Sequence, residues 1–452
     1  MQRSDIMSSG STDDVSKENV TVVQETRERS IDANTDCESD ERRYIGGWRL
    51  WILSLSVALC LFLVNIEVSV VGTSLVSISE DLNGFHNSTW VITGYLITYT
   101  SMIVLWAKLS DLTGRKFATI ATVTIFVAFS AGCGAAQSMN QLIVCRVFQG
   151  IGAAGCASLS LTLAYEMVPE EKYPQQAAQL SVAIAFGSLV GPLIGGGASQ
   201  NSQWRWVFLF NVPAGAVTII LLWMTLPKNF PNQGNPSHVG TLEGLLAARS
   251  SLARIDGLGA FLLLGASMLL IAVLLEGGVS IEWSSKTSIA LFTTSGILWL
   301  AFAGNEWYFT SDKHRTEPIF PWRFVTNRVW MGTLIISMLS GIPYNILIID
   351  IPQRLQTISG LSPFQAGVRL IPFNFLISFG TVVINIVAKV TGILPINLIL
   401  FGSIIQLIGL ALFCTLPTDG SIPAAMYGYQ SIAGFGIGCV IGILLQMPPK
   451  VV

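Results

Sequence analysis

Charged side chains are scarce in this sequence. Asp, Glu, Lys and Arg make up only 12% of the 452 residues, whereas an ordinary soluble domain has about 25%. The net charge of −2 gives no indication of nucleic-acid binding. The three histidines do not cluster, and no C-x-x-C pair occurs among the seven cysteines, so we predict neither a metal site nor a disulfide framework. A phosphate-binding G-x-x-x-x-G-K-[ST] loop is also missing, which leaves ATP-driven chemistry without support. We therefore expect neither an enzyme nor a bound cofactor.

Apolar residues are abundant instead. They make up 51% of the chain, and the mean hydropathy is +0.60. They occur in runs of about 20 residues, the length that crosses the hydrocarbon core of a bilayer. The sequence therefore predicts an all-α polytopic membrane protein with about twelve transmembrane helices. The runs cover residues 48–72, 89–108, 117–136, 141–163, 178–199, 205–226, 257–276, 286–306, 331–351, 369–389, 393–415 and 421–445.

Basic residues lie mainly in the connections on one side of the predicted helices. This distribution predicts a cytoplasmic N-terminus, because Lys and Arg concentrate in cytoplasmic loops. Asn87-Ser88-Thr89 then lies outside and makes Asn87 a candidate N-glycosylation site. The cytoplasmic connections carry Arg42, Arg43, Arg49, Lys108, Arg115, Lys116, Lys172, Lys228, Arg249, Arg254, Lys313, Arg315, Arg323, Arg328 and Lys389, and the outer ones carry only Arg205, Lys286, Arg354 and Arg369.

Three polar segments separate or precede the apolar runs. Residues 1–43 are rich in Ser, Thr and charged side chains and are predicted to be a disordered cytoplasmic tail. Residues 227–256 form the longest connection, and its second half has leucines near one helical face, which is consistent with an interfacial helix. Residues 307–330 are predicted to be a second cytoplasmic loop.

The connection after the second apolar run contains the order Asp111-x-x-Gly114-Arg115-Lys116. Arg115 can pair with Asp111, and Gly114 allows a tight turn between two helices. General enrichment of basic residues in cytoplasmic loops would explain Arg115 and Lys116 but not the complete order.

Two charged residues lie inside apolar runs, away from their ends. Glu67 is flanked by apolar residues in the first run. A carboxyl group in such surroundings can take up and release protons near neutral pH. Arg146 lies in the fourth run, where an arginine costs at least about 2.5 kcal/mol unless it faces a cavity or an acid. The alternative is that Arg146 extends towards the outer membrane surface.

Glycines line one face of the fifth apolar run. Gly187, Gly191 and Gly195 recur every four residues, followed by Gly196, and Pro192 favours a kink. Such a face lets a neighbouring helix approach closely and could form a pivot or a seal. A static helix-packing face is the alternative.

Together these strings resemble the motifs of the major facilitator superfamily. The resemblance is to the fourteen-span drug:proton antiporter branch, of a fungal efflux-pump type. Asp111 to Lys116 resembles the loop between helices two and three, Arg146-x-x-Gln149-Gly150-x-Gly152 the helix-four motif, and the glycine string the antiporter motif. Glu67 stands where the branch usually has Asp, and Ala107 where the superfamily usually has Gly.

The resemblance implies a fold and site residues. It implies an N-terminal six-helix bundle over residues 44–226, two linking helices over 257–306, and a second bundle that begins at 331. Only four helices are visible from 331 to 452, so the last two spans of the branch are expected to be lacking. Glu67 and Arg146 would serve in proton coupling, and Asn65 and Gln149 are candidate polar residues of the cavity.

The resulting functional expectation is a transporter that exports a small organic molecule, such as a drug, toxin or fungal secondary metabolite, by proton antiport. Its partners would be the substrate, protons and the lipid bilayer. The plasma membrane is the expected location, with the vacuolar membrane as the alternative. An uptake transporter, for example for siderophores, and a truncated protein that does not transport remain alternatives.

Overall fold

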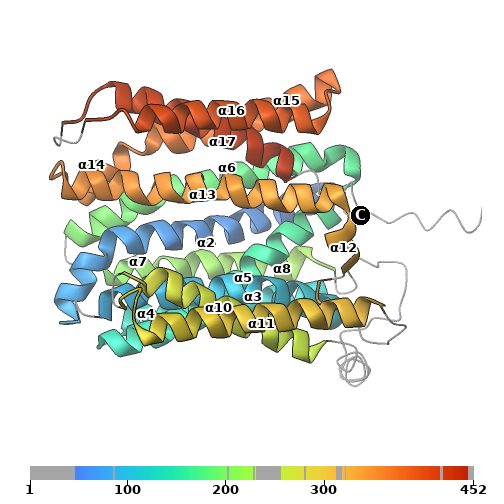
Figure 1. Cartoon of the computed structure of the whole chain (residues 1–452), viewed down its shortest axis with the longest axis horizontal. Helices are drawn as coiled ribbons and strands as arrows, with labels where there is room; N and C mark the ends of the chain where they lie inside the picture. Colours follow the sequence, from blue (N-terminus) through green and yellow to red (C-terminus); the bar gives the residue numbers. More distant parts are fainter. Residues whose placement is uncertain are drawn as a thin grey trace, which may run out of the picture. The chain divides into compact units, whose positions relative to one another are not determined.

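A computed structural model describes residues 46–84, 87–200, 203–227, 230, 256–278, 281–311, 318–320, 322–417 and 421–445. The tail over 1–43 and the interfacial helix expected within 241–254 lie outside these residues. Within the described ranges nearly every segment is helical and no β-strand occurs (Figure 1). Among the described residues, twelve helices are long and apolar enough to cross a membrane. The predicted all-α membrane fold is therefore confirmed.

The helices follow the apolar runs closely. The first group is α2 (Trp48–Asp81), α3 (Ser88–Thr113), α4 (Arg115–Ala135), α5 (Met139–Glu166), the short η2 (Glu170–Lys172), α6 (Tyr173–Gln200), α7 (Arg205–Leu209) and α8 (Asn211–Thr225). The connecting pair is α10 (Gly257–Glu276) and α11 (Lys286–Ser311). The last group is α12 (Trp322–Thr326), α13 (Arg328–Thr357), α14 (Pro363–Val368), α15 (Ile371–Thr391), α16 (Pro395–Phe413) and α17 (Ala425–Leu444).

Local sequence signals set several helix ends. Ser138, Asp256, Asn327 and Ser362 each precede a helix, and each side chain accepts a hydrogen bond from a backbone N–H of the first turn. These bonds satisfy donors that have no partner inside the helix. Gly392 ends α15 in the left-handed region, at φ 63°, which glycine adopts without strain.

The predicted loop over 307–330 is shorter in the structure. α11 continues to Ser311, and α12 occupies Trp322–Thr326. Two side chains of α11 hold the start of α12: the Glu306 Oε2 atom accepts from Phe320 N at 3.1 Å, and Thr310 Oγ1 accepts from Trp322 N at 3.0 Å. These polar anchors were not evident from the hydropathy pattern.

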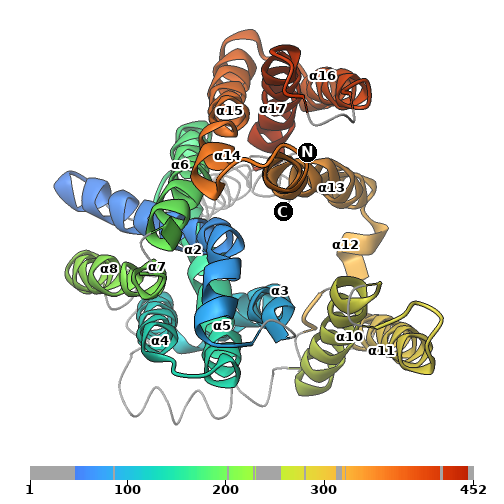
Figure 2. The same ribbon diagram turned by 90° about the vertical axis from the view of Figure 1, so that its left-hand side faces the viewer.

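The packing of α6 matters most for the functional site. α6 packs along α2 on one side and contacts α14 and α15 on the other, as the end-on view shows (Figure 2). α10 packs against α11 and α3, whereas α15, α16 and α17 pack together. α6 therefore joins the first group of helices to the last. The division into two bundles at residues 226 and 331 stays a prediction.

Candidate functional site

Glu67 lies near the middle of α2 in a fully buried position. Its side chain is 1% exposed. The Oε1 atom is 2.5 Å from Arg146 Nη1, and the Oε2 atom accepts a hydrogen bond from Asn211 Nδ2, also at 2.5 Å. The carboxylate therefore joins α2 to α5 and α8, two helices that are distant in the sequence.

Arg146 completes its contacts inside the first group of helices. Its Nη1 atom donates to Gln149 Oε1 at 2.8 Å, and its Nε atom donates to Val91 O at 3.1 Å. The guanidinium lies over the rings of Tyr95, 4.1 Å from the centroid, and Phe208, at 5.7 Å. Because Arg146 is only 1% exposed, it does not extend to the membrane surface. That alternative is wrong, and the arginine pairs with the acid instead.

Gln149 extends this network to α4. Its Nε2 atom donates to Ser130 Oγ at 2.7 Å, while its Oε1 atom accepts from Cys133 Sγ at 3.5 Å as well as from Arg146. Gln149 is 0% exposed, so in this structure it is part of the buried network and does not line an open cavity. Asn65, the other candidate for the cavity, is half-buried and donates to Leu61 O at 2.8 Å.

The network has balanced charge and few unused atoms. One carboxylate faces one guanidinium, and most of the remaining polar atoms have partners. The Asn211 Oδ1 atom is a buried exception without a partner among the described residues. A proton that binds Glu67 would remove the charge that Arg146 pairs with, and the contacts among α2, α5 and α8 would have to change. A charge change at Glu67 would therefore act on the contacts that join these three helices.

A second ionic cluster holds the turn between α3 and α4. Arg115 Nη1 is 2.6 Å from Asp111 Oδ1, and the same guanidinium contacts Ser110 Oγ. Its Nε and Nη2 atoms donate to the two carboxylate oxygens of Glu166 at 3.0 and 2.7 Å. Glu166 ends α5, so this bidentate pair ties the α3–α4 turn to a third helix. The sequence pattern indicated Asp111 but not Glu166 or Ser110.

The neighbouring Lys116 reaches a fourth helix. Its Nζ atom donates to the backbone oxygens of Trp223 and Leu226 at 2.7 and 2.6 Å. These carbonyls lie at the end of α8, where the helix has no internal donors for them. Gly114 has φ 89°, a conformation in which a side chain would be strained, so the predicted tight turn depends on this glycine.

The glycines of α6 face two different neighbours. A Cβ atom on Gly187 would lie 2.9 Å from Phe62 O of α2, whereas one on Gly196 would lie 2.9 Å from the Cα and N atoms of Phe364 in α14. Ser74 of α2 donates to Gly195 O at 3.2 Å. Gly191 is buried, and α6 continues as a helix through Pro192. The glycines therefore let α6 pack closely against α2 on one side and against α14 on the other.

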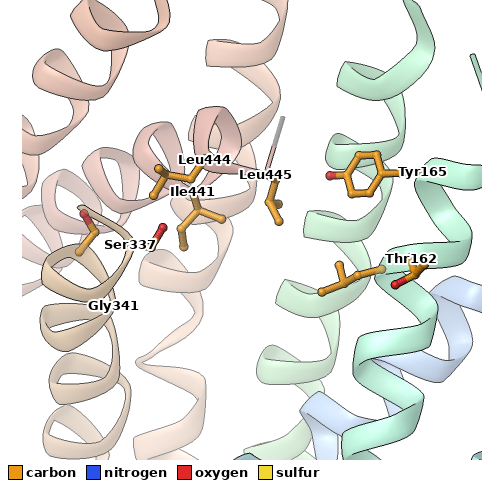
Figure 3. Close-up of a pocket in the computed structure, with 9 residues that line it drawn as sticks. Thr162, Tyr165, Ser337, Gly341, Ile441, Leu444 and Leu445 are labelled. Carbon is orange, nitrogen blue, oxygen red and sulfur yellow. The ribbon is translucent and has the colours of Figure 1, made fainter. Parts of the chain in front are cut away.

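A cavity of about 490 Å³ lies between α5, α13 and α17 (Figure 3). It is at the end of the protein where α5 and α17 finish. The last turns of α5 form one wall. The other walls come from the first half of α13 and the last turn of α17. The lining residues are Leu161, Thr162, Tyr165, Ser337, Ser340, Gly341, Ile441, Leu444 and Leu445. None of the site residues expected from the sequence is among them. Asn87, the candidate glycosylation site, is exposed directly before α3.

Comparisons with known proteins agree with this architecture. The family model described as "Major Facilitator Superfamily" matches residues 57–452. The MFS-type transporter FPY5 of Fusarium mangiferae is 38% identical over 418 residues, which cover 92% of this chain and 69% of that protein. The efflux pump DEP3 of Fusarium langsethiae is 31% identical, with coverage of 92% and 73%.

A solved structure shares the fold at low sequence identity. It is the proton:xylose symporter XylE bound to 6-bromo-6-deoxy-D-glucose, with a TM-score of 0.53 and 13% identity. The alignment covers 88% of this chain and 82% of that one. With a family match over most of its length, twelve spanning helices and transporter relatives, this chain belongs to the major facilitator superfamily and is a membrane transporter, not an enzyme.

Proposed function

We propose that this transporter exports a small organic molecule in exchange for protons. The observation that carries the proposal is the buried pair of Glu67 and Arg146 at the junction of α2, α5 and α8. An ionisable group inside a membrane bundle is costly and is retained where it serves a function, such as proton transfer. Here the acid accepts hydrogen bonds from two other helices, α5 and α8, so a change in its charge would act on packing.

The proton would act by changing the charge balance of the network. When Glu67 is ionised, it accepts hydrogen bonds from Arg146 and Asn211 and holds their helices together. When it is protonated, Arg146 has no counter-charge and keeps only neutral acceptors, which include Gln149 Oε1 and Val91 O. Coupled transport needs two packing arrangements of the helices, one with Glu67 protonated and one with Glu67 ionised.

The direction of transport has separate support. DEP3 is called an efflux pump, and export is the role we propose for this chain by that likeness. The close-packing glycines of α6, which resemble an antiporter motif, point the same way. A drug, toxin or secondary metabolite of a fungus is the class of substrate we propose.

The membrane orientation that we propose follows the basic residues. The cluster of Arg115 and Lys116 would lie on the cytoplasmic side with the N-terminus, because Lys and Arg concentrate there. The plasma membrane is the site at which an exporter of this kind would discharge its substrate from the cell.

The test is transport by the purified chain in liposomes with an imposed pH gradient. An enclosed pH-sensitive dye reports the proton flux that small aromatic compounds induce. We expect Glu67→Gln to abolish this flux while the protein still inserts and folds. Glu171→Gln removes an acid that is exposed in η2 and should leave the flux intact.

Each other outcome contradicts a defined part of the proposal. Undiminished proton flux in Glu67→Gln would remove this acid from the mechanism. Accumulation of compound in the direction of import would favour an uptake transporter, for example for siderophores. The absence of any flux in the unmodified chain, with folded protein in the membrane, would indicate a protein that does not transport.

A further inference from the structure

The cavity between α5, α13 and α17 has no charged side chain in its lining. Its walls combine hydroxyl-bearing residues with aliphatic ones. The hydroxyl groups are those of Thr162, Tyr165, Ser337 and Ser340. A volume of about 490 Å³ is within the usual range for sites that bind small molecules, roughly 300–1,000 Å³. The chemistry of this wall determines which molecules can be held there.

The nearest ionic groups of α5 are already paired. Glu166, directly after Tyr165, accepts two hydrogen bonds from Arg115. Arg146 is bound to Glu67 and is 1% exposed. A charged ligand would therefore give up its hydration in the cavity without gaining a counter-charge, which is unfavourable. A neutral molecule does not incur this cost.

Two of the hydroxyl groups can act only as hydrogen-bond acceptors towards a ligand. Thr162 Oγ1 donates to Ser158 O at 3.0 Å, and Ser337 Oγ donates to Thr333 O at 2.8 Å. Their protons are used within their own helices, so their oxygens can only accept from a ligand. Figure 3 shows that Thr162 and Ser337 belong to opposite walls. A ligand that satisfies both needs a hydrogen-bond donor at each side.

Tyr165 lines the cavity between these two walls. Its hydroxyl oxygen is buried, and it has no hydrogen-bond partner within the described part of the chain. The ring is fixed by an edge contact with Tyr173, with centroids 5.2 Å apart. A buried hydroxyl without a partner is unfavourable, so a rotation of this side chain that turned the hydroxyl into the cavity would let a ligand bond to it. The leucine and isoleucine side chains at the end of α17 would cover the carbon skeleton.

From these observations we infer that the cavity selects an uncharged molecule that carries hydroxyl groups on an apolar skeleton, and disfavours organic cations and carboxylates. This inference rests on the proposed function only in taking the cavity as the substrate site. It adds the substrate class, which neither the buried acid nor the relatives define.

The test measures binding to the purified full chain in lipid nanodiscs, with empty nanodiscs subtracted. Four naphthalene probes share one ring system: a diol, its dimethyl ether, a hydroxynaphthoate and a hydroxynaphthyl trimethylammonium ion. We expect the diol to bind at least about tenfold more tightly than either ion. The dimethyl ether keeps the neutral skeleton without donors and should bind about five- to tenfold more weakly than the diol.

Variants then test the contacts. Thr162→Val combined with Ser337→Ala removes both acceptor oxygens, so it should reduce diol binding to the level of the dimethyl ether and leave binding of the ether, which has no donors, unchanged. Ser431→Ala in α17 is the control, because its hydroxyl donates to Tyr427 O and does not line the cavity. A general packing defect would instead weaken both probes.

The outcomes separate this inference from the proposed function. Equal or tighter binding of either ion, or no binding of the diol, would overturn the inference even if proton-coupled flux is observed with other compounds. The expected binding order without any proton-coupled flux would support the substrate class and contradict the transport mechanism. A double variant that binds the diol normally would also overturn the assignment of these hydroxyl groups.

Discussion

The pair of Glu67 and Arg146 allows a quantitative test by a double-mutant cycle. Glu67→Gln and Arg146→Gln each remove one charge and keep an amide that can form hydrogen bonds. The combined variant has no buried charge at this position. Both side chains are 1% exposed and 2.5 Å apart, so water cannot replace the missing partner in either single variant.

The expected losses differ between the two single variants. Removing one partner of a buried ion pair typically costs about 3–5 kcal/mol. In Glu67→Gln, the remaining Arg146 keeps Val91 O, Gln149 and the ring of Tyr95, so we expect the lower value, about 3 kcal/mol. In Arg146→Gln, the remaining carboxylate keeps neutral amide partners, Asn211 among them, but has no cation beside it, so we expect about 5 kcal/mol.

The combined variant should be more stable than Arg146→Gln alone. With single losses of about 3 and 5 kcal/mol and a combined loss below about 5, the interaction energy of the cycle should be at least about 3 kcal/mol, at the upper end of the range for residues in one network. The measurement is the free energy of unfolding in mixed micelles titrated with a denaturing detergent. Glu171→Gln serves as the exposed control and should change stability by less than about 0.5 kcal/mol. Additivity of the two single effects within about 0.5 kcal/mol would show that the charges do not interact and would refute the reasoning.

Three further predictions concern other parts of the chain. Arg115→Lys loses the bidentate contact with Glu166 and should lower stability by about 1–2 kcal/mol in the same assay, with little further loss when Glu166→Gln is added. Gly152→Ala should cost about 1–3 kcal/mol, because its Cβ atom would lie 2.5 Å from a backbone nitrogen of α4, while Gly428→Ala has open space and should be nearly neutral. If Asn87 is glycosylated in a eukaryotic host, Asn87→Gln should increase electrophoretic mobility, and unchanged mobility with and without glycosidase would exclude the modification.

The sequence was sufficient to place the helices and the two charged residues. Span positions follow from apolar length, since a bilayer requires about 20 residues whatever the tertiary structure. Glu67 and Arg146 were recognisable because ionisable residues in apolar runs are rare. That they bind each other, across 79 positions, is a property of the packed bundle.

The partners that sequence reasoning missed are ordinary polar residues at distant positions. Asn211 is 144 residues from Glu67, and Glu166 is 51 residues from Arg115. Asn and Glu at helix ends are common, so nothing in their local pattern distinguishes them. The cavity was missed for a related reason. Its hydroxyl and aliphatic residues lie on three helices that are far apart in the sequence, and they line one space only when α5, α13 and α17 pack together.

The glycine string of α6 illustrates how one sequence feature can have two structural roles. Gly187 allows contact with the backbone of α2, inside the first group of helices. Gly196 allows contact with the backbone of α14, in the last group. The cavity lies between the two groups at the other end, near the last turns of α5 and α17. The two groups therefore touch at the Gly196 end and leave space at the cavity end. If they rock against each other during transport, closing the cavity requires the contact at Gly196 to open.

Alanine substitutions in α6 separate these roles. Gly187→Ala should lower stability by about 1–3 kcal/mol, because neither helix of the first group can move away. Gly196→Ala should push α14 away and favour the arrangement with a closed cavity. A free-energy bias of about 1 kcal/mol would change the ratio of closed to open arrangements roughly fivefold. The readout is the rate at which a soluble maleimide labels Ser337→Cys in a background without Cys37 of the N-terminal segment and without the exposed Cys414. We expect slower labelling in Gly196→Ala and an unchanged rate in Gly197→Ala, whose added methyl group meets no atom within 4 Å. Equal labelling rates in all three proteins would mean that the contact between α6 and α14 does not control access to the cavity.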